Sequence, residues 1–357
     1  MLPLWGEETL ASRLSPLWTL SGEGSTGSRN NLGSAPRTMT HARIAFLFPG
    51  QASQYVGMGR DLYDRYPLVR TLYQQAHEIT GSDIAGISFT GPAEKLKQTK
   101  YTQLAILVHS VAIASLLNEQ EIKPEYLAGH SLGEYSGLVA AGSLSFEETV
   151  RLVSLRGDLM NEAGKRRPGT MAAIIGLPQS TIDEICHEST TKDESVQMAN
   201  FNSPLQTVIA GAVPAVERAI TAARTAGAKR ALRLAVSGAF HSELMEYARK
   251  GLADAIGKAP ISRAKIPVIA NVTGQPVVEV DDIRSLLIEQ LTRPVRWAES
   301  MERLVVEGVD TIVEVGPGNV LSGLMRRTHR GVSVFNTDTI DNVSGLGEAL
   351  GANNVEK

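Results

Sequence analysis

The sequence predicts an α/β fold in which a smaller unit is inserted into a larger one. Two short apolar runs, at 44–48 and 126–128, each end in a glycine-containing turn, as buried strands do at the edge of a sheet. Between residues 169 and 234 the pattern reads strand, helix, strand, strand, helix, strand. That order is the ferredoxin-like signature, and it predicts a separate small domain.

The first apolar run, at 44–48, reads as a buried strand that leads into a tight loop containing Gln51 and Ser53. Taken alone, the loop is only a turn. Ligand sites in open α/β sheets lie at the carboxyl ends of strands. Gln51 is therefore a candidate donor to an oxyanion.

The second run leads into a serine between two glycines, Gly129-His130-Ser131-Leu132-Gly133. This G-x-S-x-G pattern is typical of a nucleophile elbow, a strained strand-to-helix turn that exposes the serine Oγ. The first helical amide, that of Leu132, would then point at an oxyanion. The pentapeptide can also arise by chance in a chain with 33 glycines, so the surrounding sequence must decide.

A capping-box pattern at Ser145 and Glu148 predicts a helix from about 146 to about 163. Arg156 and Met160 lie on the apolar face of this helix. A guanidinium there is costly unless it meets a carboxylate, which it can bind through two parallel hydrogen bonds. An internal salt bridge or a snorkelling side chain is the alternative, but the nearby serine favours a substrate carboxylate.

The small unit lies between Arg156 and His241 in the sequence. Two polar residues, Asn200 and Asn202, fall near the junction of two of its strands, where they serve either as turn formers or as ligand contacts. We expect strands at 171–176, 196–199, 207–210 and 229–234, and helices at about 179–187 and 213–226. The active site should lie in the cleft between the two domains.

These patterns divide the chain into three parts. Residues 39–166 and 237–357 form the expected α/β-hydrolase-like large domain with its nucleophile elbow, and residues 167–236 form the ferredoxin-like insertion. Residues 1–38 are rich in Ser, Gly, Leu and Pro and have no apolar run long enough for a signal peptide or a membrane span. We expect this leader to be non-catalytic.

A serine nucleophile needs a base, and His241 is the best candidate among seven histidines. It follows a loop of small residues and precedes a helix start at about 242, the kind of position where catalytic groups concentrate. Spacing alone makes it a candidate and no more. The other histidines adjoin the serine, occupy polar helical stretches or an apolar run, or precede the first strand: His41, His77, His109, His130, His187 and His329.

Six motifs follow one another between about residues 44 and 325. They are PGQ at 49–51 with SQ at 53–54, GHSLGEYS at 129–136, LRG at 155–157 with Met160, NFNSP at 200–204 with Gln206, GAFHS at 238–242, and EVGPG at 314–318. In this order they resemble the motifs of the malonyl-CoA:acyl carrier protein transacylases, the acyltransferase family of fatty acid and polyketide synthesis.

The resemblance implies a role for each matching residue. Ser131 would be the nucleophile, His241 the base and Arg156 the clamp for the malonyl carboxylate. The backbone amides of Gln51 and Leu132 would form the oxyanion hole.

The resemblance also explains why no obvious acid follows the serine in the order usual for elbow enzymes. The resemblance implies a serine-histidine dyad in which a main-chain carbonyl takes the place of the acid and orients the histidine. The residue at the matching position here is Gln290. Phe240 resembles the bulky residue that crowds an α-methyl group in malonyl-selecting relatives, with core packing as the alternative. Met160, Asn200 and His130 are further candidates for substrate contact.

One departure from the family pattern lies beside the expected oxyanion hole. Ala52 stands where many relatives have glycine. We expect this to change little if the residue has a negative φ.

Composition fits a cytoplasmic enzyme. The 357-residue chain has a net charge of −3, which argues against broad nucleic-acid affinity. Its single cysteine, Cys186, allows no disulfide or cysteine-based zinc framework within one chain, which indicates a reducing compartment. We expect no cofactor, no metal, no membrane partner and a monomer.

The function implied by the resemblance is transfer of a malonyl group from malonyl-CoA to the phosphopantetheine thiol of an acyl carrier protein, through a malonyl-serine intermediate, for fatty acid synthesis. A trans-acting polyketide synthase acyltransferase would use the same chemistry with another carrier. A serine thioesterase or acyl hydrolase would share Ser131 and His241 but would not need Arg156. A carrier-binding module without catalysis is the least favoured alternative, because nucleophile and base are both present.

Overall fold

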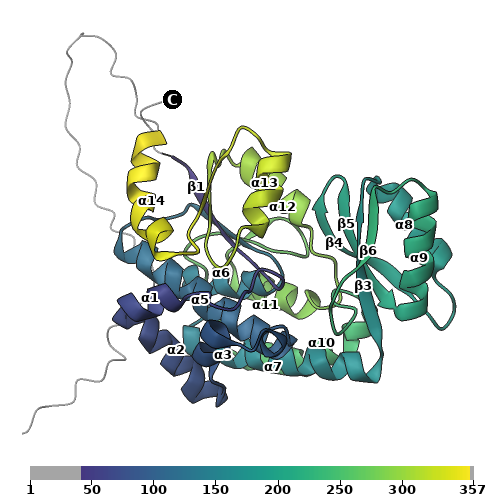
Figure 1. Ribbon diagram of the computed structural model, residues 1–357, viewed down its shortest axis with the longest axis horizontal. Coiled ribbons are helices and arrows are strands. Elements are labelled where there is room, and N and C mark those ends of the chain that lie inside the picture. Colours follow the sequence, from purple (N-terminus) through teal and green to yellow (C-terminus); the bar gives the residue numbers. More distant parts are fainter. Residues whose placement is uncertain (1–41, 354–357) are drawn as a thin grey trace, which may run out of the picture.

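The computed structural model describes residues 42–353 and contains two β-sheets. Figure 1 shows the smaller sheet beside the larger α/β part, with helices α8 and α9 on its outer side. The leader expected at 1–38 lies outside the described residues.

The larger sheet has six strands in the order β10-β9-β1-β2-β7-β8. The first five are parallel, and β8 pairs antiparallel with β7. The strands are β1 (Ile44–Phe48), β2 (Tyr126–Gly129), β7 (Val268–Ile269), β8 (Pro276–Val277), β9 (Thr311–Glu314) and β10 (Ser333–Asn336).

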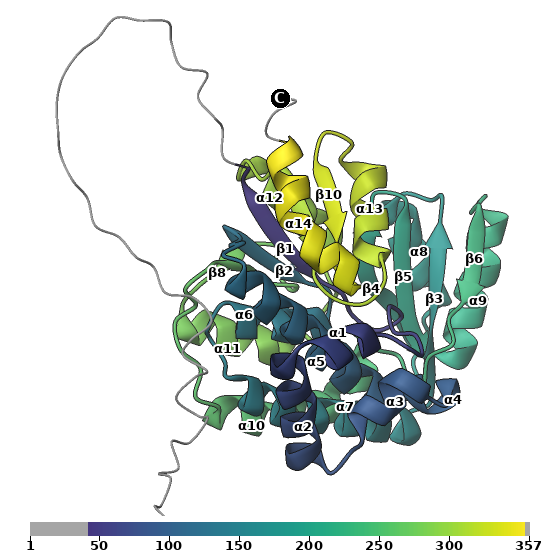
Figure 2. The same ribbon diagram turned by 60° about the vertical axis from the view of Figure 1, so that its left-hand side comes forward.

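Helices cover both faces of this sheet (Figure 2). Because strand side chains alternate between faces, Phe46 and Phe48 belong to one buried cluster, whereas Ala45 and Leu47 belong to another. The helices of this part are α1 (Arg60–Arg65), α2 (Pro67–Thr80), α3 (Ile84–Thr90), α4 (Ala93–Leu96), α5 (Thr99–Glu119), α6 (Leu132–Ala140), α7 (Phe146–Arg166), α10 (Glu246–Lys258), α11 (Val280–Glu289), α12 (Trp297–Val306), α13 (Val320–Thr328) and α14 (Ile340–Asn353), with a 3-10 turn at Glu243–Met245.

Helix α5 is the one helix of the described residues that is long and apolar enough to cross a membrane. Of its most apolar stretch, 89% is buried inside the protein. Its residues from Leu104 to Leu117 belong to the main core cluster almost without interruption. The apolar composition of α5 is therefore explained by core packing.

The smaller sheet is antiparallel, in the order β4-β5-β3-β6, and α8 and α9 pack on it around a core of their own. Its elements follow the predicted order, strand, helix, strand, strand, helix, strand. They are β3 (Gly169–Ile175), α8 (Gln179–Ser189), β4 (Val196–Ser203), β5 (Gln206–Ala212), α9 (Val213–Thr225) and β6 (Arg230–Arg233). Strand β4 extends beyond the expected end at 199, into the NFNS segment.

A segment of the larger part pairs with the free edge of β4. Val295 donates its N–H to the Ala199 carbonyl at 2.8 Å and accepts from the Phe201 N–H at 2.9 Å. Asn200 and Val295 form a parallel bridge. The chain just after Gln290 is thereby held against the smaller sheet.

Candidate active site

Ser131 occupies a strained turn between β2 and α6. Its backbone has φ 54° and ψ −101°, a conformation that residues with a Cβ rarely adopt. The helix begins at the next residue, Leu132. The elbow predicted from the sequence is therefore present.

The two glycines that flank Ser131 are required by close backbone approach. A Cβ at Gly129 would lie 1.9 Å from the carbonyl carbon of Gly133, and one at Gly133 would lie 2.0 Å from the Phe48 oxygen. No real Cβ atom tolerates such distances. The spacing of the pentapeptide follows from the packing of β1, β2 and α6.

His241 contacts the serine with one ring nitrogen and a main-chain carbonyl with the other. Its Nε2 lies 2.8 Å from Ser131 Oγ and its Nδ1 lies 2.8 Å from the Gln290 oxygen. A carbonyl can only accept, so Nδ1 carries the proton and Nε2 accepts from the serine hydroxyl. Burial, followed by the nearby charge of Arg156, lowers the pKa of His241 to about 3, so the imidazole is neutral.

Arg156 is 1% exposed, which excludes the snorkelling alternative. One terminal nitrogen donates to Gln103 Oε1 at 2.8 Å, and the other donates to Gln290 Oε1 and to Ser131 Oγ, both at 3.0 Å. No carboxylate of the described residues forms an ion pair with it, which excludes the internal salt bridge, and its Nε has no partner there. Burial lowers the pKa of Arg156, as expected for a cation held by neutral acceptors.

The amides of Gln51 and Leu132 belong to residues that line the same cavity as Ser131. Among residues 42–353, neither amide has a hydrogen-bond acceptor. The Ser131 amide is already used, because it donates to Asn271 Oδ1 at 2.7 Å. Ala52, beside Gln51, has φ 88° and not the negative φ considered above, so an alanine here adopts a conformation that favours glycine.

The cavity around Ser131 has a volume of about 270 Å³ and lies between the two sheets. Its walls include the remaining predicted contact residues, Met160, Asn200, Phe240 and His130. The Nε2 of His130 lies 2.9 Å from Asn202 Oδ1 on the smaller sheet. His130 thus links the elbow to the smaller sheet. Burial lowers the pKa of His130.

The remaining histidines of the described residues lie elsewhere. His109, the histidine of the apolar run, is fully buried in α5, with Nε2 3.3 Å from Asp338 Oδ1. His329 contacts Glu302 at 3.1 Å. His77 and His187 are exposed on α2 and α8.

Three buried polar residues complete the site and were not identified from the sequence. Gln103 holds Arg156, and Asn271 holds the elbow, donating to the Gly129 carbonyl at 2.6 Å. Glu134, 3% exposed, accepts from the Gln290 side chain at 2.8 Å. Burial raises the pKa of Glu134 to about 7. Glu134 lies within the GHSLGEYS motif, which is the one signal that could have singled it out.

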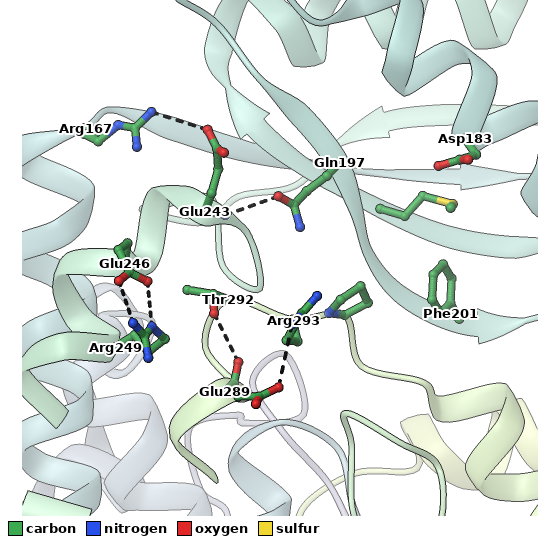
Figure 3. A pocket seen from close by; sticks show the side chains of 12 residues that line it. Arg167, Asp183, Gln197, Phe201, Glu243, Glu246, Arg249, Glu289, Thr292 and Arg293 are labelled. Carbon is green, nitrogen blue, oxygen red and sulfur yellow. Dashed lines mark hydrogen bonds and ion pairs between the residues drawn. The ribbon is translucent and has the colours of Figure 1, made fainter. Parts of the chain in front are cut away.

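A second, more open depression of about 860 Å³ is lined by residues of the smaller sheet, of the turn and helix at 243–249 and of the segment 289–294 (Figure 3). Gln197 connects the two, because its amide donates to the His241 carbonyl at 3.4 Å. The three arginines of the depression are each paired with a glutamate, in the pairs Arg167–Glu243, Arg249–Glu246 and Arg293–Glu289.

Comparison with known proteins gives a consistent result. The model of the acyl transferase domain family matches residues 45–344. Malonyl CoA-acyl carrier protein transacylase from Bacillus subtilis is 44% identical over 303 residues, covering 84% of this chain and 96% of that protein. The enzyme of the same name from Escherichia coli K12 is 43% identical over 309 residues, covering 86% and 99%.

Solved structures agree with the sequence comparison. The malonyl CoA-acyl carrier protein transacylase of Coxiella burnetii superposes with a TM-score of 0.84 at 42% identity, covering 87% of this chain and 98% of that one. A malonyl-transacylase in complex with a type II polyketide synthase acyl carrier protein superposes with a TM-score of 0.83 at 41% identity. The match covers 86% of this chain and 100% of that one. On this evidence the chain belongs to the acyl transferase domain family, among the malonyl CoA-acyl carrier protein transacylases.

Proposed function

We propose that this protein transfers a malonyl group from malonyl-CoA to the phosphopantetheine thiol of an acyl carrier protein for fatty acid synthesis. One observation carries the proposal. The Ser131 hydroxyl lies 2.8 Å from a neutral imidazole and 3.0 Å from a buried guanidinium that has no carboxylate partner within residues 42–353. A nucleophile, a base and a carboxylate site meet in one cavity.

In the first half-reaction Ser131 Oγ attacks the thioester carbonyl while His241 Nε2 takes the hydroxyl proton. The negative charge of the tetrahedral intermediate forms where the amides of Gln51 and Leu132 can donate to it. Collapse breaks the C–S bond, CoA leaves as the thiol with the proton from His241, and a malonyl-serine ester remains. The Gln290 carbonyl keeps the imidazole in the required tautomer.

In the second half-reaction the carrier thiol attacks the malonyl-serine ester with the same base, and Ser131 recovers its proton. The cycle is therefore ping-pong and uses only protein side chains and amides, with no cofactor. Arg156 holds the malonyl carboxylate in both halves, and Phe240 crowds the position of an α-methyl group. Met160, Asn200 and His130 shape the rest of the acyl pocket.

We further propose that the two sheets mark two domains. The larger, α/β-hydrolase-like domain comprises residues 39–166 and 237–357, the ferredoxin-like domain comprises 167–236, and the leader at 1–38 takes no part in catalysis. The protein acts as a cytoplasmic monomer, and its partners are malonyl-CoA and the carrier protein, without nucleic acid or membrane.

The test is intact-mass analysis of the enzyme mixed with malonyl-CoA and then with carrier protein. We expect a malonylated enzyme that loses the group as malonyl-carrier forms. A hydrolase would instead lose the group to water at the same rate without carrier. Supplying fatty acid and polyketide carriers in parallel identifies the carrier, since one similar protein was solved with a polyketide synthase carrier.

A further inference from the structure

Gln290 is the residue through which the parts of the site are connected. Its main-chain oxygen accepts from His241, and its side-chain oxygen accepts from Arg156 at 3.0 Å. Its side-chain nitrogen donates to the Ser131 carbonyl at 3.0 Å and to Glu134 Oε2 at 2.8 Å. Displacing the side-chain amide would disturb the nucleophile elbow and the carboxylate site together, whereas the base is held by the main-chain oxygen.

The direction in which this amide points depends on its neighbours. Glu134 Oε2 and the Ser131 carbonyl are acceptors toward Gln290, so the NH₂ group must face them and the oxygen must face Arg156. In the reverse orientation the amide oxygen would oppose two oxygens, and the NH₂ group would oppose a guanidinium. A polar group left unpaired in this buried position is costly, so the orientation is fixed.

Glu134 is itself fixed independently of Gln290. It lies in the first turn of α6, where the helix dipole favours a negative charge, and its Oε2 also accepts from the Asn271 amide at 3.2 Å. It touches neither the serine hydroxyl nor the expected place of substrate. An effect of Glu134 on the reaction can therefore pass through Gln290 or through Asn271, whose side chain accepts from the Ser131 amide. The route through Gln290 is the one that reaches both Ser131 and Arg156.

We infer that Glu134 is a positioning residue, whose carboxylate oxygen orients the Gln290 amide and thereby sets both the acylation rate of Ser131 and the preference for a carboxylate-bearing acyl group. This inference rests on the proposed function. A merely structural role would change the free energy of unfolding and leave the preference for malonyl over acetyl unchanged.

Two variants separate the acceptor from the charge. Glu134→Gln keeps an oxygen that can accept from Gln290 and Asn271, whereas Glu134→Met keeps the approximate length and removes the acceptor. Because displacing reacting groups by about 1 Å costs on the order of 100-fold, we expect Glu134→Met to slow single-turnover acylation by malonyl-CoA roughly 10- to 100-fold. We also expect the ratio of malonyl to acetyl acylation to fall in Glu134→Met. Glu134→Gln should retain most of the wild-type rate and most of the wild-type ratio.

A double-mutant cycle tests whether the effect passes through Gln290. The variant Gln290→Met keeps the main-chain carbonyl and removes the amide. If Glu134 acts through this amide, the double variant should acylate within about twofold of Gln290→Met alone. Ser143→Ala is a stability control, because the buried Ser143 loses a part-buried 2.8 Å hydrogen bond to the Ser262 carbonyl after the end of α6, and it should leave the ratio unchanged.

The outcomes are distinct. The inference is overturned if Glu134→Met keeps the wild-type acylation rate and malonyl-to-acetyl ratio, or if Glu134→Gln loses as much of both as Glu134→Met does. It is also overturned if the double variant is slower than Gln290→Met by the full factor that Glu134→Met shows alone. Glu134→Ala takes the place of Glu134→Met if circular dichroism shows that the latter does not fold. Failure of the wild-type protein to form any malonyl-serine would instead contradict the proposed function.

Discussion

Arg156→Ala is the most informative perturbation of substrate selection. The guanidinium is 1% exposed, and its acceptors among the described residues are two amide oxygens and the Ser131 hydroxyl, none of which is charged. A bound malonyl carboxylate would supply the opposite charge that this part of the chain does not. Removing one partner of a buried pair costs about 3 to 5 kcal/mol. Malonyl transfer should therefore fall by roughly 10² to a few times 10³.

Acetyl transfer gives the comparison within the same variant. An acetyl group has no carboxylate, so it loses nothing to the missing charge. Truncation does leave the side-chain oxygens of Gln103 and Gln290 without their donor, so the melting temperature should fall whether or not Arg156 binds substrate. The ratio of malonyl to acetyl transfer is the diagnostic quantity, and the melting temperature is not.

The assay is single-turnover acylation with each acyl-CoA, followed by intact-mass analysis. Arg151→Ala on the same helix is a matched control, because its side chain is 58% exposed and should change neither rate. Arg156→Lys keeps the charge but loses the planar fork and should recover only part of the preference. An Arg156→Ala enzyme that still prefers malonyl to acetyl as the wild type does would refute the clamp.

Three other predictions follow from the same geometry. His241→Ala should slow acylation by about 10² or more while the circular dichroism spectrum stays native, and normal turnover would place the base elsewhere. The pKa of His241 falls from its ordinary 6.5 to about 3 on folding, so acid protonates the imidazole of the unfolded chain first. The contribution of His241 to the free energy of unfolding is therefore fully present above pH 6.5 and decreases as the pH falls from 6.5 toward 3. Denaturant melts over this range should show a steeper decrease for wild type than for His241→Ala, and parallel curves would contradict the shift. Gly133→Ala forces a Cβ against the Phe48 oxygen and should destabilise the protein by about 1 to 3 kcal/mol or more in denaturant melts, with unchanged stability as the contrary result.

The parts of the fold and site that depend on local sequence could be predicted. The elbow follows from glycine spacing, and the position of Arg156 follows from a helical period with a clear N-cap at Ser145. His241 follows from a small-residue loop before a short helix capped by Ser242. Each of these signals is contained within a few turns of chain.

The connecting residues could not be found from local sequence, and Gln290 was named only through the family resemblance. Gln290 and Asn271 reach Ser131 from 159 and 140 residues away, and nothing in their own neighbourhoods distinguishes them. Gln290 is placed by the pairing of Val295 with β4, a contact between distant segments. The φ of Ala52 was left open by the sequence analysis, and the structure gives it the positive value of 88° that favours glycine.

The central claim, that Ser131 carries the acyl group between two thiols, is tested most directly by intact-mass and peptide mapping of wild type and Ser131→Ala after mixing with malonyl-CoA. The account predicts one malonyl group on wild-type Ser131, its release on addition of carrier protein, and no adduct on the variant. A malonylated Ser131→Ala enzyme, or transfer to the carrier by that variant, would contradict it.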